Sequence, residues 1–225
     1  CILLAGLFAQ GKTCVTEQGQ SRNHTELMLP VFGVNLEAPC CVRGGSRLLA
    51  ANIDVPADIS SAAFFMVAAA IVPDSEVCLR NVGINSTRDG IVRVLQAMGA
   101  DIELMNSRKF GGETVADVRV RYRDTLQGSD IPEDWVPSLI DELPIIMILA
   151  TAAKGITRIR GAEELRVKES DRIAVMAKGL EAMGIELQEY EDGIDIHPGG
   201  FHLRHLGVDL PVAVGVCGVP IPFFQ

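Results

Sequence analysis

Residues 145–188 decide the fold: "IIMILATAAKGITRIRGAEELRVKESDRIAVMAKGLEAMGIELQ". The stretch opens with an apolar, Ala-rich run that has no polar face, which predicts a helix buried on every side. After a glycine turn, "ITRIRGA" (156–162) is typical of a strand, and "KESDR" (168–172) is a polar loop with a serine and an arginine. An amphipathic helix follows and ends at Gly184, and "IELQEY" (185–190) predicts a closing strand.

Two earlier stretches, residues 3–37 and 64–104, repeat this order of features. Their amphipathic helices end at Gly33 and Gly99, and a glycine just past a helix end suits the left-handed C-cap conformation. The sequence therefore predicts three copies of one helix–strand–helix–strand unit. The expected strands of the first two copies are residues 12–17, 34–37, 76–82 and 100–104.

The first copy contains "GLFAQGKT" (6–13), a literal match to the phosphate-binding pattern G-x-x-x-x-G-K-[ST]. A working nucleotide loop lies between a strand and a following helix, whose N-terminus faces the phosphates. Here the order is helix, glycine, strand, and the other two copies have no G-K-T. We therefore interpret the match as accidental and Lys12 as a solvated turn residue.

Composition limits the function classes. The chain of 225 residues is long enough for one large or two small domains, and its 48% hydrophobic and 22% charged residues are ordinary for a soluble globular protein. A net charge of −9 argues against a nucleic-acid partner, although anions can still bind where cations and helix N-termini converge. No apolar run approaches membrane-spanning length, so no membrane partner is expected.

The six cysteines include no C-x-x-C pair, which disfavours a zinc site or a redox pair. Scattered cysteines in a chain of this length fit reduced thiols and a cytoplasmic location. The chain does not begin with Met, and we interpret its apolar start as a truncation inside a helix.

Two segments are candidate linkers. Residues 51–61 join the first two copies and offer Ser60 or Ser61 as a helix N-cap. Residues 124–144 join the last two copies, and a loop this long in a compact domain is often functional.

The segment 163–172 gathers charge at the start of a helix. Ser170 is a good N-cap, and Lys168 and Arg172 flank the same helix N-terminus, so a phosphate or carboxylate would be held well there. Glu169 lies between the two cations, which would lower its pKa. The plainer interpretation is a capped helix start with surface ion pairs.

Asp141 precedes a wholly apolar helix that has Pro144 in its first turn. It either caps this helix or, at the edge of a dry region, acts as a tuned general base. Glu142 is interpreted as a partner of the helix dipole.

The segment "SRNHTE" (21–26) also places polar and charged residues at the start of a predicted helix. Ser21 or Asn23 can cap the next helix, and Arg22 lies near the same N-terminus and can hold a phosphate. His24 has no evident metal partner and is interpreted as structural. Arg88, in "STRDG", is expected to make structural ion pairs.

"DISSAAFF", "GINSTRDGIVRVLQAMGADIE", "LIDELPI" and above all "GAEELRVKESDRIAVMAKGL" closely resemble the 5-enolpyruvylshikimate-3-phosphate synthase family. The resemblance covers residues 1 to about 199 and implies an α/β fold: enolpyruvyl transferase-like repeats of a βαβαββ unit, with buried parallel helices and sheets facing solvent. It further implies that residues 1–56 end a first domain, that 57–200 form most of a second, and that 201–225 are an unmatched tail.

The resemblance also implies an activity: transfer of the enolpyruvyl group of phosphoenolpyruvate to the 5-hydroxyl of shikimate-3-phosphate, in aromatic amino acid biosynthesis. By the same resemblance, Asp141 is the base near that hydroxyl and Glu169 carries the proton to the enol carbon. Lys168, Ser21 and Arg22 contact shikimate-3-phosphate, and Arg172 grips phosphoenolpyruvate. No metal or organic cofactor is implied.

Some residues depart from the family pattern. This chain has "QGQ" at 18–20, Asn23, Ala57 and Ser86 where the family usually has PAP, Asp, Gly and Pro. Ala57 would be strained if that site needed a positive φ. After about residue 200 the family's "GDHR" motif is missing, and a shifted reading frame or an artificial end is expected there.

Two rival hypotheses remain. One is a catalytically inactive fragment that folds and at most binds anions, and we expect the isolated fragment to lack activity. The other is the related UDP-N-acetylglucosamine enolpyruvyl transferase, whose family places a catalytic cysteine on a loop. The cysteines here lie in expected strands or turns, and "RVKESDR" favours the shikimate enzyme.

Overall fold

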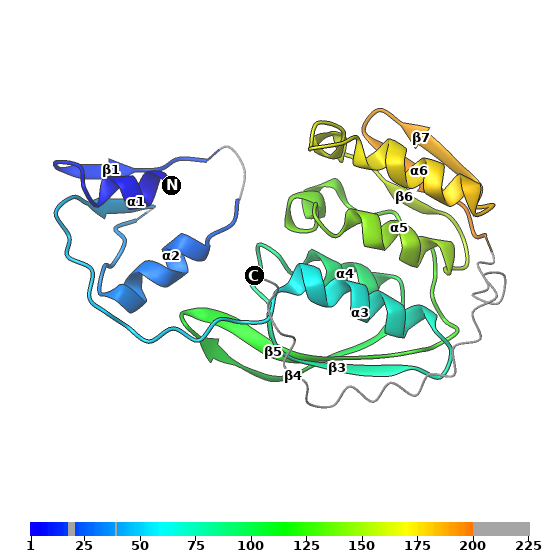
Figure 1. Ribbon diagram of the computed structural model, residues 1–225, viewed down its shortest axis with the longest axis horizontal. Helices are drawn as coiled ribbons and strands as arrows, with labels where there is room; N and C mark the ends of the chain where they lie inside the picture. The colour runs from blue at the N-terminus through cyan, green and yellow to red at the C-terminus, as the bar shows by residue number, and fades with distance from the viewer. Residues whose placement is uncertain (18–20, 39, 200–225) are drawn as a thin grey trace.

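The computed structural model describes residues 1–17, 21–38 and 40–199, and it has a small N-terminal part beside a larger α/β body (Figure 1). The N-terminal part contains α1 (Ile2–Gly6), β1 (Lys12–Cys14), α2 (His24–Met28), the 3-10 helix η1 (Leu29–Phe32) and β2 (Cys41–Arg43). Strands β1 and β2 pair antiparallel. Its core is small and consists of Leu3, Leu7, Leu29, Val34 and Val42.

The body contains two units with the same order of elements. The first body unit comprises α3 (Ile59–Ile71), β3 (Glu76–Gly83), α4 (Gly90–Ala97), β4 (Asp101–Phe110) and β5 (Glu113–Arg121). The second body unit comprises α5 (Leu143–Thr151), β6 (Thr157–Ile159), the 3-10 helix η3 (Glu163–Arg166), α6 (Arg172–Ala182), β7 (Leu187–Tyr190) and β8 (Gly193–Ile196). The 3-10 helix η2 (Glu133–Ser138) lies in the segment between them.

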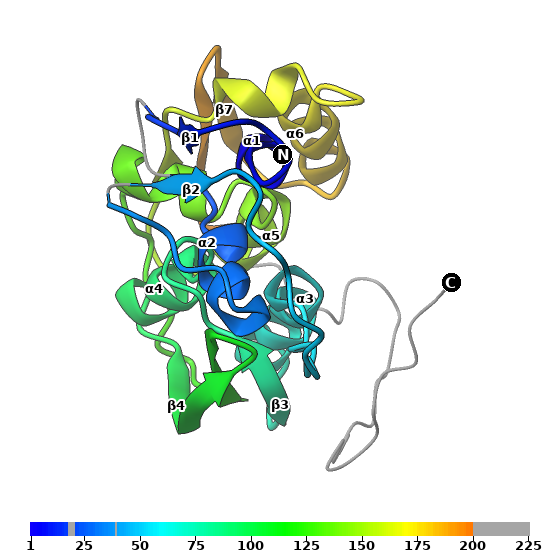
Figure 2. The same cartoon turned by 90° about the vertical axis from the view of Figure 1, so that its left-hand side faces the viewer.

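Each body unit forms one antiparallel three-stranded sheet, and both sheets have the same topology. The order is β3-β5-β4 in the first unit and β6-β8-β7 in the second, so the last strand of each unit lies in the middle. Figure 2 shows β3 and β4 at one end of the body and β7 at the other, with the helices between them. Buried helices and outward-facing sheets are the predicted architecture, and this prediction is confirmed.

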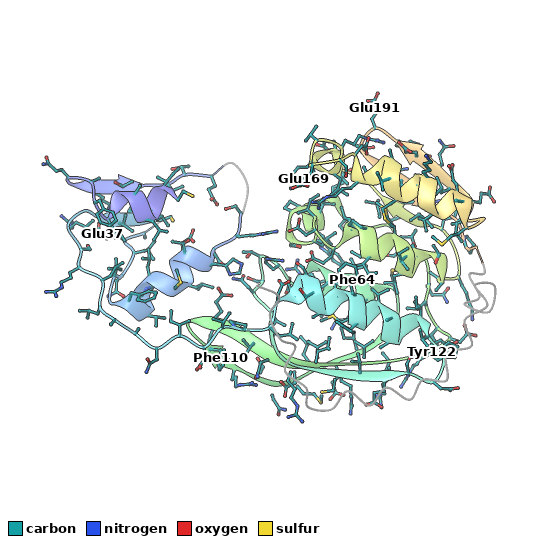
Figure 3. The ribbon with its side chains drawn as sticks, in the orientation of Figure 1. Glu37, Phe64, Phe110, Tyr122, Glu169 and Glu191 are labelled. Atoms are coloured by element: carbon teal, nitrogen blue, oxygen red, sulfur yellow. A yellow bond between two sulfur atoms is a disulfide. The ribbon has the colours of Figure 1, made fainter. Side chains whose placement is uncertain are left out.

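Apolar runs make the two central helices buried, but not to the same extent. In α5, Ile146, Met147 and Leu149 are fully buried. In α3, one side packs into the core, whereas Phe64 and Phe65 are 59% and 50% exposed on the other (Figure 3). The prediction of a helix buried on every side is therefore wrong for α3, because an apolar run does not reveal whether a neighbour covers each face.

The predicted helix ends are largely confirmed. Gly33, Gly99 and Gly184 follow helices with φ of 82°, 78° and 82°, the left-handed conformation that glycine adopts without strain. Asn23 lies at the N-cap position of α2, one of the two positions predicted there, but its side chain makes no capping hydrogen bond. The predicted N-caps of α3 and α6 are wrong by one to three residues. Asp58, not Ser60 or Ser61, caps α3 by accepting from their backbone N–H groups, and Asp171, not Ser170, caps α6 through Ala174.

The structure also shows that the G-K-T match in the N-terminal part is not a nucleotide-binding loop. The helix α1 comes before the glycine, and Lys12 begins strand β1, so the arrangement lacks the strand-then-helix order that a nucleotide loop requires. Lys12 pairs with Glu37 at 2.8 Å. A strand predicted over residues 34–37 is reduced to one bridge between Glu37 and Cys41, and β2 went unpredicted.

A disulfide joins Cys14 to Cys41. The two residues face each other in the register of β1 and β2, which brings their side chains together. The expectation of reduced thiols is wrong for this pair, because the sequence did not reveal that the two strands are neighbours. Cys1 and Cys40 remain thiols, and Cys217 lies outside the described residues.

The linker and the hairpin of the first body unit connect the body to the N-terminal part. Ala57 forms a bridge with Val82 and is absent from the non-glycine residues with positive φ in the described chain, so the strain expected there does not occur. Gly111 and Gly112, at φ 59° and 89°, form the turn between β4 and β5. A Cβ on Gly112 would lie 2.4 Å from the carbonyl oxygen of Leu27, so glycine permits this close approach to α2.

Within the described ranges, no helix combines the length and the apolar character that crossing a membrane requires.

Candidate active site

The helices α3, α5 and α6 all begin at the end of the body that faces the N-terminal part (Figure 1). Helix N-termini present free N–H groups and a partial positive charge. The repeated topology therefore places several such termini, and the charged residues before them, at one edge of the molecule. Glu169 lies at this edge in Figure 3.

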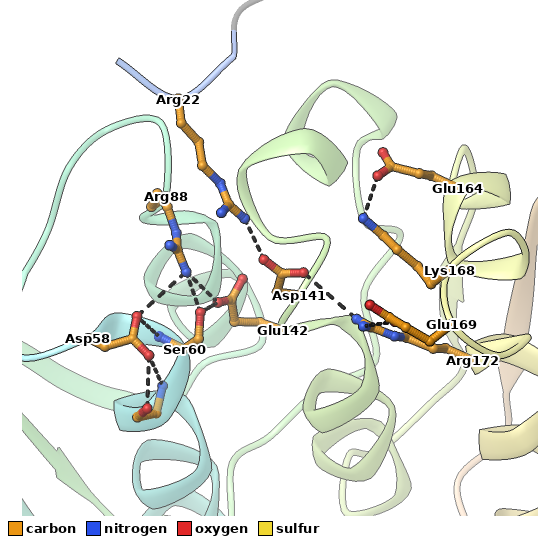
Figure 4. Close-up of polar contacts among 11 residues, drawn as sticks. Arg22, Asp58, Ser60, Arg88, Asp141, Glu142, Glu164, Lys168, Glu169 and Arg172 are labelled. Carbon is orange, nitrogen blue, oxygen red and sulfur yellow. Dashed lines mark hydrogen bonds and ion pairs between the residues drawn. The ribbon is translucent and has the colours of Figure 1, made fainter. Parts of the chain in front are cut away.

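Asp141 lies just before α5, at the centre of this edge (Figure 4). Its carboxylate accepts a hydrogen bond from the Arg22 guanidinium and lies 3.8 Å from that of Arg172. Burial opposes ionisation of Asp141, but Arg22, Arg88 and Lys168 outweigh it and lower its pKa. The Asp141 side chain is one-third exposed, so an incoming molecule can reach it.

The loop before α6 contributes the second set of predicted residues. Arg172 donates to Glu169 at 2.9 Å, and Lys168 pairs with Glu164 at 2.5 Å. A backbone N–H and the Arg172 guanidinium lower the pKa of Glu169, as predicted, so this carboxylate is ionised at neutral pH. Its side chain is 83% exposed.

A separate arginine holds this loop in place. Arg166 pairs with Asp171 at 2.8 Å and with Glu189 at 3.0 Å, and it donates to the backbone carbonyls of Tyr190 and Glu191. These contacts attach the loop to the edge of the second body unit's sheet. The loop residues are therefore positioned by a fixed scaffold, although several are exposed.

Arg22 extends from the segment before α2 in the N-terminal part, 119 residues away in sequence from the Asp141 that it contacts. Ser21 lies beside it but bonds locally: its hydroxyl donates to Glu17 at 2.5 Å. The structure thus brings together Arg22, Asp141, Lys168, Glu169 and Arg172. Among the described residues, Ser21 makes its side-chain hydrogen bond to Glu17 and none to Asp141, Lys168, Glu169 or Arg172. His24 lies 2.6 Å from Glu113.

Sequence reasoning missed a buried group behind Asp141. Glu142 was interpreted as a dipole partner, but its side chain is only 2% exposed and accepts a hydrogen bond from Ser60. Arg88 lies 3.5 Å from Glu142 and 3.7 Å from Asp58. The signal was available in part, because a charged residue at the start of a wholly apolar helix must find a partner.

Next to this group lies a hollow of about 200 Å³, between the linker and the first body unit. Its lining includes Arg88, Asp58, His24 and Glu113. In the described ranges, three or more His, Cys, Asp and Glu side chains nowhere gather in a way that could hold a metal ion. The site contains arginines, a lysine and carboxylates, and its cations suit anionic molecules.

The fold matches solved structures. The enolpyruvyl transferase NikO from Streptomyces tendae aligns with 88% of the chain at a TM-score of 0.63 and 17% identity, covering 45% of that protein. At this identity the likeness concerns the fold alone. Together with the repeated units, it defines the chain's fold as enolpyruvyl transferase-like.

More specific matches follow. The family model for EPSP synthase (3-phosphoshikimate 1-carboxyvinyltransferase) matches residues 1–210, and the chain belongs to this family. An EPSP synthase structure from Acinetobacter baumannii aligns with 88% of the chain and 45% of its own length, at 53% identity and a TM-score of 0.83.

Curated relatives agree. The 3-phosphoshikimate 1-carboxyvinyltransferase of Methylococcus capsulatus is 55% identical over 89% of this chain and 46% of its own. That of Xanthomonas oryzae is 55% identical over 88% of this chain and 46% of its own. The chain therefore spans about half the length of the curated relatives that it matches.

Proposed function

We propose that the chain supplies part of the active site of an enzyme that transfers the enolpyruvyl group of phosphoenolpyruvate to the 5-hydroxyl of shikimate-3-phosphate. The observation that carries the proposal is the position of Asp141 between Arg22 and Arg172, which come from opposite ends of the described chain. Two cations flanking one carboxylate suit a reaction in which anionic substrates meet a base. The family membership supports the same assignment.

In this proposal Asp141 accepts the proton of the 5-hydroxyl while that oxygen bonds to the central carbon of phosphoenolpyruvate. Glu169 delivers a proton to the methylene carbon, and the roles reverse as the C–O bond to phosphate breaks and phosphate leaves. Arg22 and Lys168, with Ser21 close in sequence, would hold shikimate-3-phosphate, and Arg172 would hold phosphoenolpyruvate. Neither step calls for a metal or an organic cofactor.

The electrostatics of the site fit the roles of Asp141 and Glu169 if substrate binding changes the surroundings of each carboxylate. Arg22 now pairs with Asp141, so a substrate phosphate that draws Arg22 away would raise the pKa of Asp141 and make it a stronger base. Glu169 is held ionised by a backbone N–H and by Arg172. The negative charges of two bound substrates would raise its pKa, so that it can carry a proton.

We further propose that residues 1–56 and 57–200 belong to two different domains, with the site between them, and that the enzyme acts in the cytoplasm. The contacts of Arg22 with Asp141 and of Asn23 with Asn85 support a site at this junction. Residues 201–225, expected to be an unmatched tail, lie outside the described residues. The family model matches the sequence through residue 210.

The test is a chimera in which residues 1–199 replace the matching segment of the Methylococcus capsulatus relative. We expect the purified chimera to release phosphate from shikimate-3-phosphate and phosphoenolpyruvate and to form the enolpyruvyl ether, which mass spectrometry detects. The unmodified relative serves as the control. A folded chimera that binds neither substrate would contradict the proposal and favour the inactive, anion-binding alternative.

A further inference from the structure

Glu142 is a buried ionisable side chain for which the proposed chemistry has no role. It directly follows Asp141 and precedes the first residue of α5, yet its side chain makes no hydrogen bond that caps this helix. The carboxylate is 2% exposed, and burial raises its pKa despite the opposing effects of Ser60 and Arg88. A carboxylate is rarely buried to this extent unless its partners are fixed around it.

Its partners form a connected polar group. The Ser60 hydroxyl donates to Glu142 and accepts from the Arg88 guanidinium, which uses both hydrogen-bonding roles of a hydroxyl. Arg88 also lies 3.5 Å from Glu142 and 3.7 Å from Asp58, the residue that caps α3. Figure 4 shows Arg88, Ser60, Glu142 and Asp58 joined by these contacts.

The group connects the starts of three helices. Ser60 lies in the first turn of α3, Arg88 lies two residues before α4, and Glu142 lies immediately before α5. Truncating any one of them would leave a buried or half-buried charge without its partner, which is costly. The relative positions of these helix starts are therefore set by charge pairing as well as by apolar packing.

Asp141 and Glu142 share a peptide unit, but their side chains diverge (Figure 4). Asp141 faces Arg22 and Arg172, whereas Glu142 faces the buried Ser60 and Arg88. Since one backbone carries both, fixing Glu142 also fixes the direction from which Asp141 enters the site. Fixed placement of a catalytic group to within about an ångström is a large part of what an active site provides.

We propose that Glu142 is a positioning residue for Asp141: together with Ser60 and Arg88 it fixes the start of α5 and balances the charge of Arg88 behind the site. The inference rests on the proposed function only in taking Asp141 as the base. The charged groups that act electrostatically on Asp141 come from the segment before α2, the loop before α4, the start of α5, and the loop and first turn of α6. They are Arg22, Arg88, Glu142, Lys168 and Arg172.

The test follows the titration of Asp141 in the purified 225-residue chain by carboxyl-carbon NMR. At the low pH where Asp141 titrates, Glu142 is already protonated, because burial raises its pKa and the neighbouring cations lower that of Asp141. Glu142→Gln keeps this neutral form and an acceptor oxygen for Ser60, so the measured pKa of Asp141 stays that of the parent. Glu142→Ala removes the acceptor of Ser60 and frees the start of α5, so Asp141 moves away from Arg22 and Arg172 and its measured pKa rises. The comparison matters, because a general loosening of the fold would move both Glu142 variants alike. Arg88→Met removes a positive charge that acts on Asp141, so the measured pKa also rises.

The matched control is Glu103→Gln, which breaks a carboxylate–arginine pair with Arg119 on the sheet of the first body unit and leaves the Asp141 titration unchanged. No shift in Glu142→Ala, or an equal shift in Glu142→Gln, would overturn the proposal. Unfolding of both Glu142 variants would also overturn it, because a positioning role requires that the fold stand without this side chain.

This experiment separates the inference from the proposed function. If the titration responds as stated but Asp141→Asn leaves turnover of the chimera unchanged, the function is wrong and the positioning role stands. If Asp141 proves essential while its titration ignores Glu142 and Arg88, the positioning role is wrong and the function stands.

Discussion

The two body units share one topology but use the charges at their helix starts differently. In the first unit the charges satisfy each other: Asp58 caps α3 and pairs with Arg88, and Asp89 before α4 pairs with Arg93. In the second unit Asp141 and the loop before α6 face outward, and Asp141 is joined by Arg22 from the N-terminal part. A repeated scaffold thus supplies several similar helix starts, and the local sequence decides which of them is structural and which is available to a ligand.

The largest expected effect is on catalysis, and it tests the difference between the two body units. Asp141→Asn in the chimera should lower kcat by about 10³, within the range of a lost general base, because the amide cannot accept the hydroxyl proton. The control is Asp89→Asn in the first body unit, which breaks only the pair with Arg93 and should keep the kcat of the parent. Steady-state phosphate release measures both. Equal losses in the two variants would remove the distinction between the units.

The next effect concerns substrate binding. Arg172→Met removes a charged donor that would hold phosphoenolpyruvate, and a charge-assisted hydrogen bond contributes about 1.5–3 kcal/mol. We expect the KM for phosphoenolpyruvate to rise by roughly 10- to 100-fold. Arg93→Met, on α4 of the first body unit, should leave this KM within about twofold. A similar rise in both variants would indicate a loss of general stability.

A smaller effect tests the structural role of the first unit. Asp58→Ala removes the side chain that accepts from the backbone N–H groups of Ser60 and Ser61, and a lost N-cap costs about 1 kcal/mol of unfolding free energy. Asp58→Asn keeps an acceptor oxygen and should lose less. Urea unfolding of the 225-residue chain at pH 7 measures the difference. No loss in Asp58→Ala would show that the cap is not stabilising.

The smallest expected effects are on the pH dependence of stability, and they have opposite signs for Asp58 and Glu142. Burial opposes ionisation of Asp58, but Ser61, Ser60 and Arg88 outweigh it and lower its pKa, so its contribution to stability is present above about pH 4 and is lost as the pH falls further. Burial raises the pKa of Glu142, so the stability contributed by its protonated form is present below about pH 4 and is lost as the pH rises.

Accordingly, the stability of Glu142→Gln relative to the parent should improve as the pH rises from 4 to 7, because glutamine does not titrate. The deficit of Asp58→Asn should shrink as the pH falls toward 3. Urea unfolding across this range measures both variants against the parent. Trends of equal sign in the two variants would contradict this account, in which the partners of Asp58 favour its ionised form and the burial of Glu142 disfavours its ionised form.

Much of the fold was predictable because its signals are local. The glycines after the amphipathic helices marked the helix ends, since their conformation depends on a few neighbouring residues. The strand β2 and the disulfide between Cys14 and Cys41 went unpredicted, because they depend on which segments become neighbours. The exposed Phe64 shows the same limit for burial.

The site was predictable to the extent that it uses helix starts. Lys168, Glu169 and Arg172 could be placed together because they lie within five residues of each other, whereas the contact of Arg22 with Asp141 spans 119 residues. The burial of Glu142 could not be predicted, because its partners Ser60 and Arg88 come from the other body unit. Its charge at the start of an apolar helix was the only local sign.

The central claim, that the second body unit and Arg22 together receive the substrate, is tested most directly by a crystal structure of the chimera with shikimate-3-phosphate bound. The account predicts the substrate 5-hydroxyl within about 3.2 Å of the Asp141 carboxylate, with Arg22 withdrawn from Asp141 toward the ligand. A substrate bound away from Asp141, or bound while the Arg22–Asp141 pair stays intact, would contradict it.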